Sequence, residues 1–127
     1  MEVIYIERMK EAYGRLFIIE NGLRKYINDK MTSFYGADWW IKAPKNMSYR
    51  ERPLEQSNFY HLENYLRAYP CFNYHDDLIF ELRKLYPIRN KIAHCIELTE
   101  EGCQTLKEAY EMIMDVVYSK VRWDGSH

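Results

Sequence analysis

Three polar residues within six positions have side chains that could act together on a phosphodiester. Arg89, Asn90 and His94 fall in the stretch 86–94, whose second residue is Pro87. Proline suits the first turn of a helix, so this stretch predicts a short helix that carries all three residues. Asn90 and His94 are four residues apart and share a face, whereas Arg89 lies about 100° round the helix and must reach back. An imidazole can move protons near neutral pH and a guanidinium can hold two phosphate oxygens, so phosphodiester cleavage is the predicted chemistry.

A plainer interpretation competes with that chemistry. Arg and His lie about this far apart by chance in most chains, so spacing alone favours ordinary polar residues on a solvated helix face. If the target is RNA, however, the neighbouring 2′-hydroxyl supplies the nucleophile and no metal is needed. His94 would then carry the proton, Arg89 would stabilise the charge on the phosphorane, and Asn90 would position the phosphate.

A second stretch, far from the first in sequence, adds to the functional interpretation. Arg89-Asn90-x-x-x-His94 resembles the R-x4-6-H motif of the HEPN superfamily, small all-helical domains found in RNases, toxins and defence proteins. One branch of that superfamily has an E-N-x-L-R first helix that leads into a W-W segment. The chain is similar to that branch in Tyr13-x-x-Leu16-Phe17-x-x-x-Glu20-Asn21-x-Leu23-Arg24-x-x-Ile27 and in Tyr35-Gly36-x-Asp38-Trp39-Trp40. The resemblance covers residues 13–40 and 78–118.

The resemblance implies a metal-independent endoribonuclease that leaves a 2′,3′-cyclic phosphate, needs no cofactor and acts in a toxin or defence role. HEPN ribonucleases are dimers whose motifs meet, so a homodimer is expected to bring together two Arg89 and two His94, with one imidazole as acid and one as base. An antitoxin or other regulatory partner is also implied, although Ile96 stands where antitoxin-modified members often carry Tyr. Some HEPN proteins only dimerise or bind nucleotide or RNA, so a non-catalytic module is the alternative.

Three further residues are candidates for orienting the motif. Glu97 follows His94 by three residues and would contact the imidazole from the same helical face. Glu20 and Asn21 belong to the first helix, which in HEPN proteins packs beside the motif. The other interpretation of Glu20 is an exposed ion pair with Arg24, four residues further on.

An RNA-binding surface has to be a local patch, because the net charge of the chain is −1. Residues 83–91 carry four basic side chains and no acid. Two adjacent indoles could stack on unpaired bases. The alternatives are a solvated helix face for the basic residues, and a core lid or subunit interface for the indoles. The residues predicted to bind RNA are Arg83, Lys84, Lys91, Trp39 and Trp40.

Length and composition predict one globular domain over residues 1–127, with 47% hydrophobic and 29% charged residues. The three cysteines form no C-x-x-C pair, which favours a reduced, cytoplasmic compartment. The sequence shows no leader and no apolar run of membrane-spanning length, so no membrane partner is expected. Cys71 and His75 are spaced like metal ligands, but no second pair completes a site, and no metal is predicted.

Apolar residues at steps of three and four predict a first helix over residues 3–29. Gly14 and Gly22 each cost about 1 kcal/mol relative to Ala in a helix interior, which indicates close approach of another helix. The predicted apolar stripe consists of Ala12, Leu16, Ile19, Leu23 and Tyr26, widened by Phe17 and Ile27.

Later segments predict further helices over residues 57–69, 76–86 and 99–121, with an irregular loop insertion over 30–57. The pattern leaves open whether Pro87 kinks the third helix or starts a new one. No strand shows convincing alternation. The expected fold is therefore all-α, an up-and-down bundle of four main helices with the short motif helix inserted.

Overall fold

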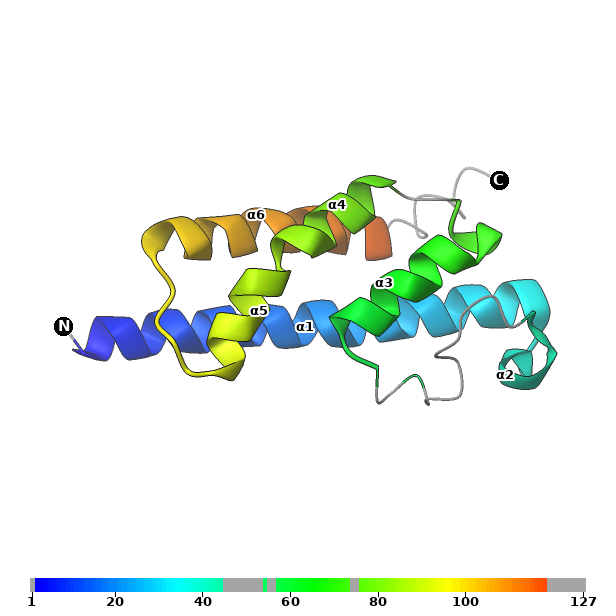
Figure 1. The fold of residues 1–127 in the computed structure, drawn as a ribbon, viewed down its shortest axis with the longest axis horizontal. Coiled ribbons are helices and arrows are strands. Elements are labelled where there is room, and N and C mark those ends of the chain that lie inside the picture. Colours follow the sequence, from blue (N-terminus) through cyan, green and yellow to red (C-terminus); the bar gives the residue numbers. More distant parts are fainter. Residues whose placement is uncertain (1, 45–53, 55–56, 74–75, 119–127) are drawn as a thin grey trace.

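The computed structural model describes residues 2–44, 54, 57–73 and 76–118, and every regular element among them is helical (Figure 1). The all-α prediction is confirmed, with four main helices and the short motif helix between the last two. The elements are α1 (Glu2–Tyr35), α2 (Trp39–Lys42), α3 (Phe59–Ala68), the 3₁₀ turn η2 (Pro70–Phe72), α4 (Asp76–Lys84), α5 (Tyr86–Ala93) and α6 (Glu100–Val117).

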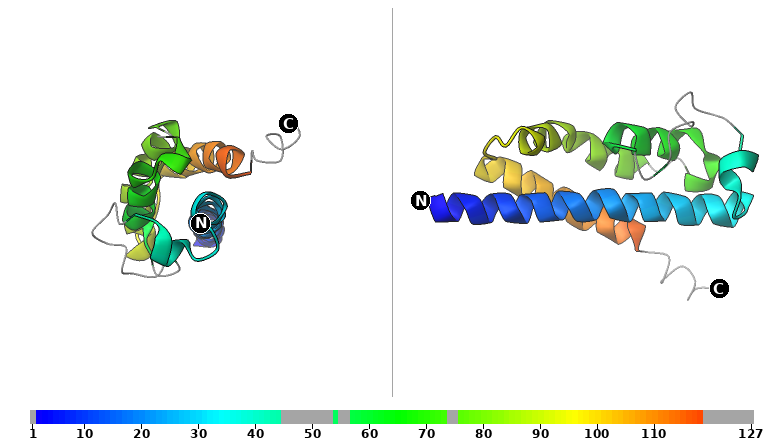
Figure 2. Two further views of the ribbon diagram at one scale, coloured as in Figure 1. Left: turned by 90° about the vertical axis from the view of Figure 1, so that its right-hand side faces the viewer. Right: turned by 90° about the horizontal axis from the view of Figure 1, so that it is seen from below.

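Helix α1 runs along the whole molecule and contacts α2, α3, η2, α5 and α6. Its 34 residues make it about 50 Å long at 1.5 Å per residue. Figure 2 shows α3, α4 and α5 as a layer along one side of α1, with α6 completing the bundle. The predicted stripe is largely confirmed, because five of its members are buried. These are Ala12, Leu16, Ile19, Leu23 and Ile27.

Two details of the α1 prediction are wrong. The helix does not stop at residue 29 but continues to Tyr35, because Met31 extends the buried stripe by one more turn. Gly36 then ends the helix with a φ of 103°, a conformation that glycine adopts at little cost, and its N–H donates to the carbonyl of Thr32. Phe17 does not widen the core, since its side chain is 58% exposed.

The two glycines of α1 have different environments. Gly22 is buried against α6, where an added Cβ would lie 3.4 Å from the terminal methyl of Met114, so the prediction of close helix approach is confirmed there. Gly14 is different, because an added Cβ would meet no atom of the described residues within 4 Å. No close helix approach explains Gly14.

Gly14→Ala is therefore expected to raise the free energy of unfolding by about 0.5–1 kcal/mol, since alanine loses less backbone entropy in a helix and nothing obstructs its methyl group. Urea unfolding followed by circular dichroism measures this change. Gly22→Ala is the matched comparison and should gain less, because Met114 must accommodate the methyl. A destabilised Gly14→Ala protein would contradict the open surface described for this position.

The predicted loop insertion over residues 30–57 is only partly irregular. Its first six residues belong to α1, and Trp39–Lys42 form the single turn α2. Residues 45–53, 55 and 56 lie outside the described part of the chain. Helix α3 begins later than predicted, with Asn58 as its N-cap: the Asn58 side chain accepts from the backbone N–H of His61, whose ring accepts from the Asn58 N–H.

Pro87 starts a new helix. Helix α4 ends at Lys84, Leu85 forms a turn, and α5 begins at Tyr86 with Pro87 in its first turn. Helix α6 starts with Thr99, whose hydroxyl oxygen accepts from the Gly102 N–H at 3.0 Å. Helix α6 extends to Val117, and residues 119–121 of its predicted range lie outside the described part of the chain. No helix among the described residues is long and apolar enough to cross a bilayer.

Candidate active site

Helix α5 presents the predicted catalytic residues at the surface. Asn90, Lys91 and His94 are exposed and Arg89 is half-buried. Within the described part of the chain, the side chains of all four take no partner in a hydrogen bond or ion pair. Two cations, a carboxamide and, at the C-cap, an imidazole thus have no polar partner within the described part of the fold.

The end of α5 fixes the backbone at His94. His94 is the C-cap, and its N–H donates to the carbonyl of Asn90 at 3.1 Å. The next residue, Cys95, has a φ of 57°, so the chain turns sharply away from the helix axis. The N–H groups of Cys95 and Ile96 return to the carbonyls of Ile92 and Lys91, which is the hydrogen-bond pattern of a Schellman turn.

This turn overturns the expected role of Glu97. Because the helix ends at Ala93, Glu97 does not follow His94 on a helical face. Its carboxylate instead lies 4.0 Å from the guanidinium of Arg8 on α1, which is also 3.9 Å from Glu100. Both acids are exposed, so these contacts contribute little to stability.

Glu20 and Asn21 also do not turn toward the motif. The Glu20 carboxylate accepts from Arg24 at 2.6 Å, as in the ion-pair interpretation of Glu20, and the Asn21 side chain donates to the carbonyl of Phe17. Arg24 then donates to the carbonyl of Ser57 at 2.7 Å. This group joins α1 to the residues before α3, and its role in the fold is structural.

A buried carboxylate that the sequence analysis missed holds the start of α5. Glu63 on α3 is 3% exposed and accepts hydrogen bonds from Arg67, from Arg83 on α4 and from the hydroxyl of Tyr86 on α5. Arg83 approaches it through two nitrogens, at 2.9 and 3.2 Å. One side chain therefore connects three helices at the point where the motif helix begins.

Hydrogen bonds and charge keep Glu63 ionised despite its burial. Burial alone would raise the pKa of Glu63, but hydrogen bonds from Arg83 and Tyr86 and the charges of Arg83 and Arg67 together lower it. Burial and the hydrogen bond to Glu63 raise the pKa of Tyr86, so its hydroxyl stays protonated and continues to donate.

The predicted RNA-binding cations divide into two groups. Arg83 is held by Glu63, and Lys84 pairs with Glu81 at 3.1 Å and lies over the ring of Phe80. Lys91 has no such partner among the described residues. Of the three cations, Lys91 alone has no ion-pair partner among the described residues, whereas Arg83 is paired with Glu63 and Lys84 with Glu81.

The two indoles are buried to different degrees, and both line a surface cleft. Trp39 is 5% exposed, donates from Nε1 to the side chain of Asn28 at 3.0 Å and meets the ring of Tyr65 edge-on. Trp40 is half-buried and packs edge-on against Trp39. The core-lid interpretation describes both residues, and the buried face of Trp39 is not available to a base.

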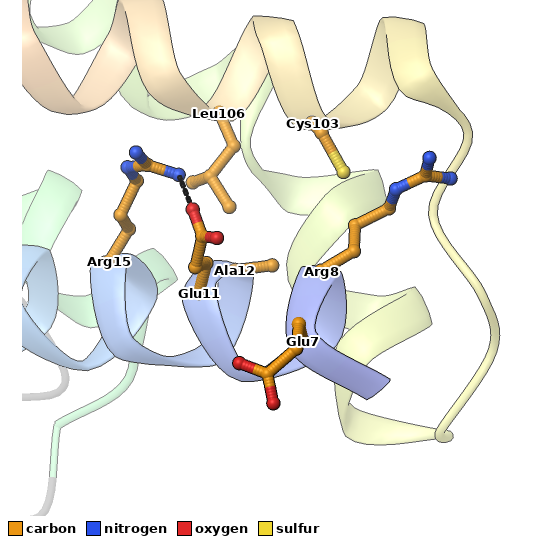
Figure 3. A pocket seen from close by; sticks show the side chains of 7 residues that line it. All are labelled: Glu7, Arg8, Glu11, Ala12, Arg15, Cys103 and Leu106. Carbon is orange, nitrogen blue, oxygen red and sulfur yellow. Dashed lines mark ion pairs between the residues drawn. The ribbon is translucent and has the colours of Figure 1, made fainter. Parts of the chain in front are cut away.

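Two other clefts lie toward the motif end of the bundle. The larger, about 410 Å³, lies between α1 and α6 (Figure 3). Its lining mixes two acids and two arginines, with Glu11 and Arg15 paired at 3.8 Å, and burial raises the pKa of its Cys103 thiol. A smaller cleft of about 210 Å³ lies beside the motif and includes Arg89 and Asn90 in its lining.

No family model matches this chain, and no similar curated protein or solved structure was found. Any functional conclusion therefore depends on the chain's own residues. In the described ranges, no three His, Cys, Asp or Glu side chains gather closely enough to hold a metal ion. His75, the second member of the Cys71 pair, lies outside those ranges.

Proposed function

We propose that this protein is a metal-independent endoribonuclease whose chemistry is carried by Arg89, Asn90 and His94. The observation that supports it best is the uncommitted state of these side chains on α5. Their neighbour Arg83 is tied to Glu63, and Arg24 on α1 to Glu20. A structural role for Arg89 and His94 would call for internal partners of that kind.

The chemistry follows from what each group can do at an RNA linkage. An imidazole takes the proton of the 2′-hydroxyl while the hydroxyl oxygen attacks phosphorus. The bond from phosphorus to the 5′-oxygen breaks, and a second imidazole donates a proton to that leaving oxygen. Arg89 stabilises the added negative charge on the phosphorane, and Asn90 donates to a phosphate oxygen. The products are a 2′,3′-cyclic phosphate and a 5′-hydroxyl.

One histidine cannot serve both ends of this displacement at once. The described part of α5 and its C-cap carries one histidine, His94, five residues after Arg89. A second copy of the chain would supply the other, so the active form in this proposal is a homodimer with two His94 and two Arg89 in one cleft. The resemblance of the sequence to HEPN proteins supports this dimeric arrangement. It also supports a toxin or defence role, in which an antitoxin or other partner regulates the enzyme.

The test is cleavage of RNA by the full chain in excess EDTA. The proposal requires fragments that end in 2′,3′-cyclic phosphate, detected by mass spectrometry, and a specific activity that falls on dilution below the dimer dissociation constant. Expression of the active enzyme should also slow growth of the host cell. Intact RNA at every protein concentration would overturn the nuclease and leave the non-catalytic binding module.

A further inference from the structure

The small cleft beside the motif has the size of a site for one planar ring system. It lies between the start of α3 and the first half of α5, and measures about 210 Å³. Sites for drug-sized ligands are larger, roughly 300–1,000 Å³. Its lining residues are Asn58, Phe59, Tyr60, Tyr86, Arg89 and Asn90.

Three of the six lining residues are aromatic. Phe59 is buried, and Tyr86 is half-buried with its hydroxyl committed to Glu63, so Tyr86 offers the cleft mainly its ring. Tyr60 is 52% exposed at the start of α3. The rings of Tyr60 and Tyr86 are accessible, and accessible aromatic faces are the usual platforms for unpaired bases, whereas Phe59 only closes the cleft from the core side.

Two carboxamides add hydrogen-bonding groups. The side-chain oxygen of Asn58 accepts from the His61 N–H at 3.1 Å. This hydrogen bond holds the amide in one orientation and leaves the amide nitrogen to donate to another group. That nitrogen donates to none of the described residues, and Asn90 is exposed. A fixed amide donor and an adaptable amide suit the acceptor-rich edge of a base.

The charge of the cleft suits a nucleotide. None of the described residues that line it is acidic, and Arg89 supplies a positive charge. The nearby carboxylate of Glu63 is buried and paired with two arginines, so it does not oppose an anion here. The cleft therefore combines ring faces, amide groups and a guanidinium that can hold phosphate.

We infer that this cleft binds an unpaired nucleobase of single-stranded RNA, the base adjoining the phosphate that Arg89 holds. The identity of that phosphate as the scissile one rests on the proposed function, but the base site itself does not. Duplex RNA cannot present this base, because its bases are stacked and paired. The enzyme should consequently cut single strands.

The inference is tested with a single-stranded 2′-O-methyl RNA oligonucleotide that contains one 2-aminopurine. This probe cannot be cleaved by 2′-hydroxyl attack, so binding is measured apart from chemistry. The full chain should bind it, measured by anisotropy, and stacking should quench the 2-aminopurine fluorescence. The same sequence as a duplex should bind more weakly and show no added quenching.

Variants at two positions assign the binding to the cleft. Tyr60→Ala should weaken binding about 5- to 140-fold and remove the quenching, whereas Tyr60→Phe should retain both. Asn58→Ser keeps a good helix cap but loses the amide donor, so binding should weaken about 2- to 10-fold. Tyr118→Ala is the matched control, because it removes a tyrosine of similar exposure, 56%, from the end of α6.

The outcomes separate this inference from the nuclease proposal. Unchanged affinity in Tyr60→Ala and Asn58→Ser overturns the base site, even if unmodified RNA is cleaved through His94. Binding that depends on Tyr60 without any cleavage supports the base site and overturns the nuclease. Competition by AMP as strong as by the oligonucleotide would identify a free nucleotide as the ligand and overturn the RNA-strand assignment.

Discussion

His94→Ala is expected to lower the rate of RNA cleavage by about 10²–10⁴-fold, the usual contribution of a general acid or base. The free energy of unfolding should change by less than about 0.5 kcal/mol, since the side chain is exposed and contacts no described partner through hydrogen bonds or ion pairs. Single-turnover cleavage of a labelled oligonucleotide and urea unfolding measure the two effects. Added imidazole should restore part of the activity, a result that a structural role for His94 does not produce.

Arg89→Ala should cause a loss of similar size, because it removes the group that stabilises the phosphorane. Lys107→Ala, on the exposed side of α6, changes the net charge equally and should leave cleavage unaltered. Equal cleavage by the wild type and by both active-site variants would mean a contaminating nuclease. Equal loss in the Lys107 variant would instead show that overall charge, not Arg89 itself, controls the reaction.

Glu63→Ala should have the largest effect on stability, a loss of about 2–4 kcal/mol in the free energy of unfolding. The substitution leaves a cavity and removes the acceptor of Tyr86 and the counter-ion of Arg83. The loss falls toward the low end of the range for buried ion pairs because both arginine partners are exposed. Glu11→Ala, which breaks the 3.8 Å pair of the exposed Glu11 with the half-buried Arg15, is the control and should cost about 1 kcal/mol or less.

Stability should also depend on pH through Glu63. Its pKa is lower in the folded protein than the value of about 4.3 for an unfolded glutamate, so folding favours the ionised form. The contribution is fully present above about pH 4.3 and is lost as the pH falls through the lowered folded value. Unfolding midpoints between pH 6 and 2 should therefore fall more steeply in the wild type than in Glu63→Gln. Parallel curves would show that Glu63 is not preferentially ionised in the folded state.

Periodicity predicted the helices well where their apolar residues recur regularly. It ended α1 too early because Asn28, Asp29 and Lys30 interrupt the stripe, although Met31 continues it. Gly36 was the better signal for the end, since a left-handed residue commonly follows a helix. The short helix α2 had no such signal, because four residues are too few to show a period.

Residues whose environment is made by distant helices were the hardest to predict. Arg67 follows Glu63 by one helical turn, so the sequence alone suggests an exposed ion pair between them. Glu63 is buried in the structure, where it contacts Arg83 on α4 and Tyr86 on α5. Arg83 was assigned to RNA for the same reason, because its partner lies twenty residues earlier. Cys95 carries no sign that it would adopt a left-handed turn, which is why Glu97 was placed beside His94.

Helix α1 packs against elements at both ends of the bundle, which limits how the protein can be divided. It contacts α3 and η2 as well as α5 and α6, so neither end of the molecule has a hydrophobic interior of its own. Splitting the chain after Tyr35 would separate α3, α5 and α6 from the helix against which they pack. The protein is accordingly a poor candidate for separation into two self-sufficient halves, and its cooperative unit is the bundle as a whole.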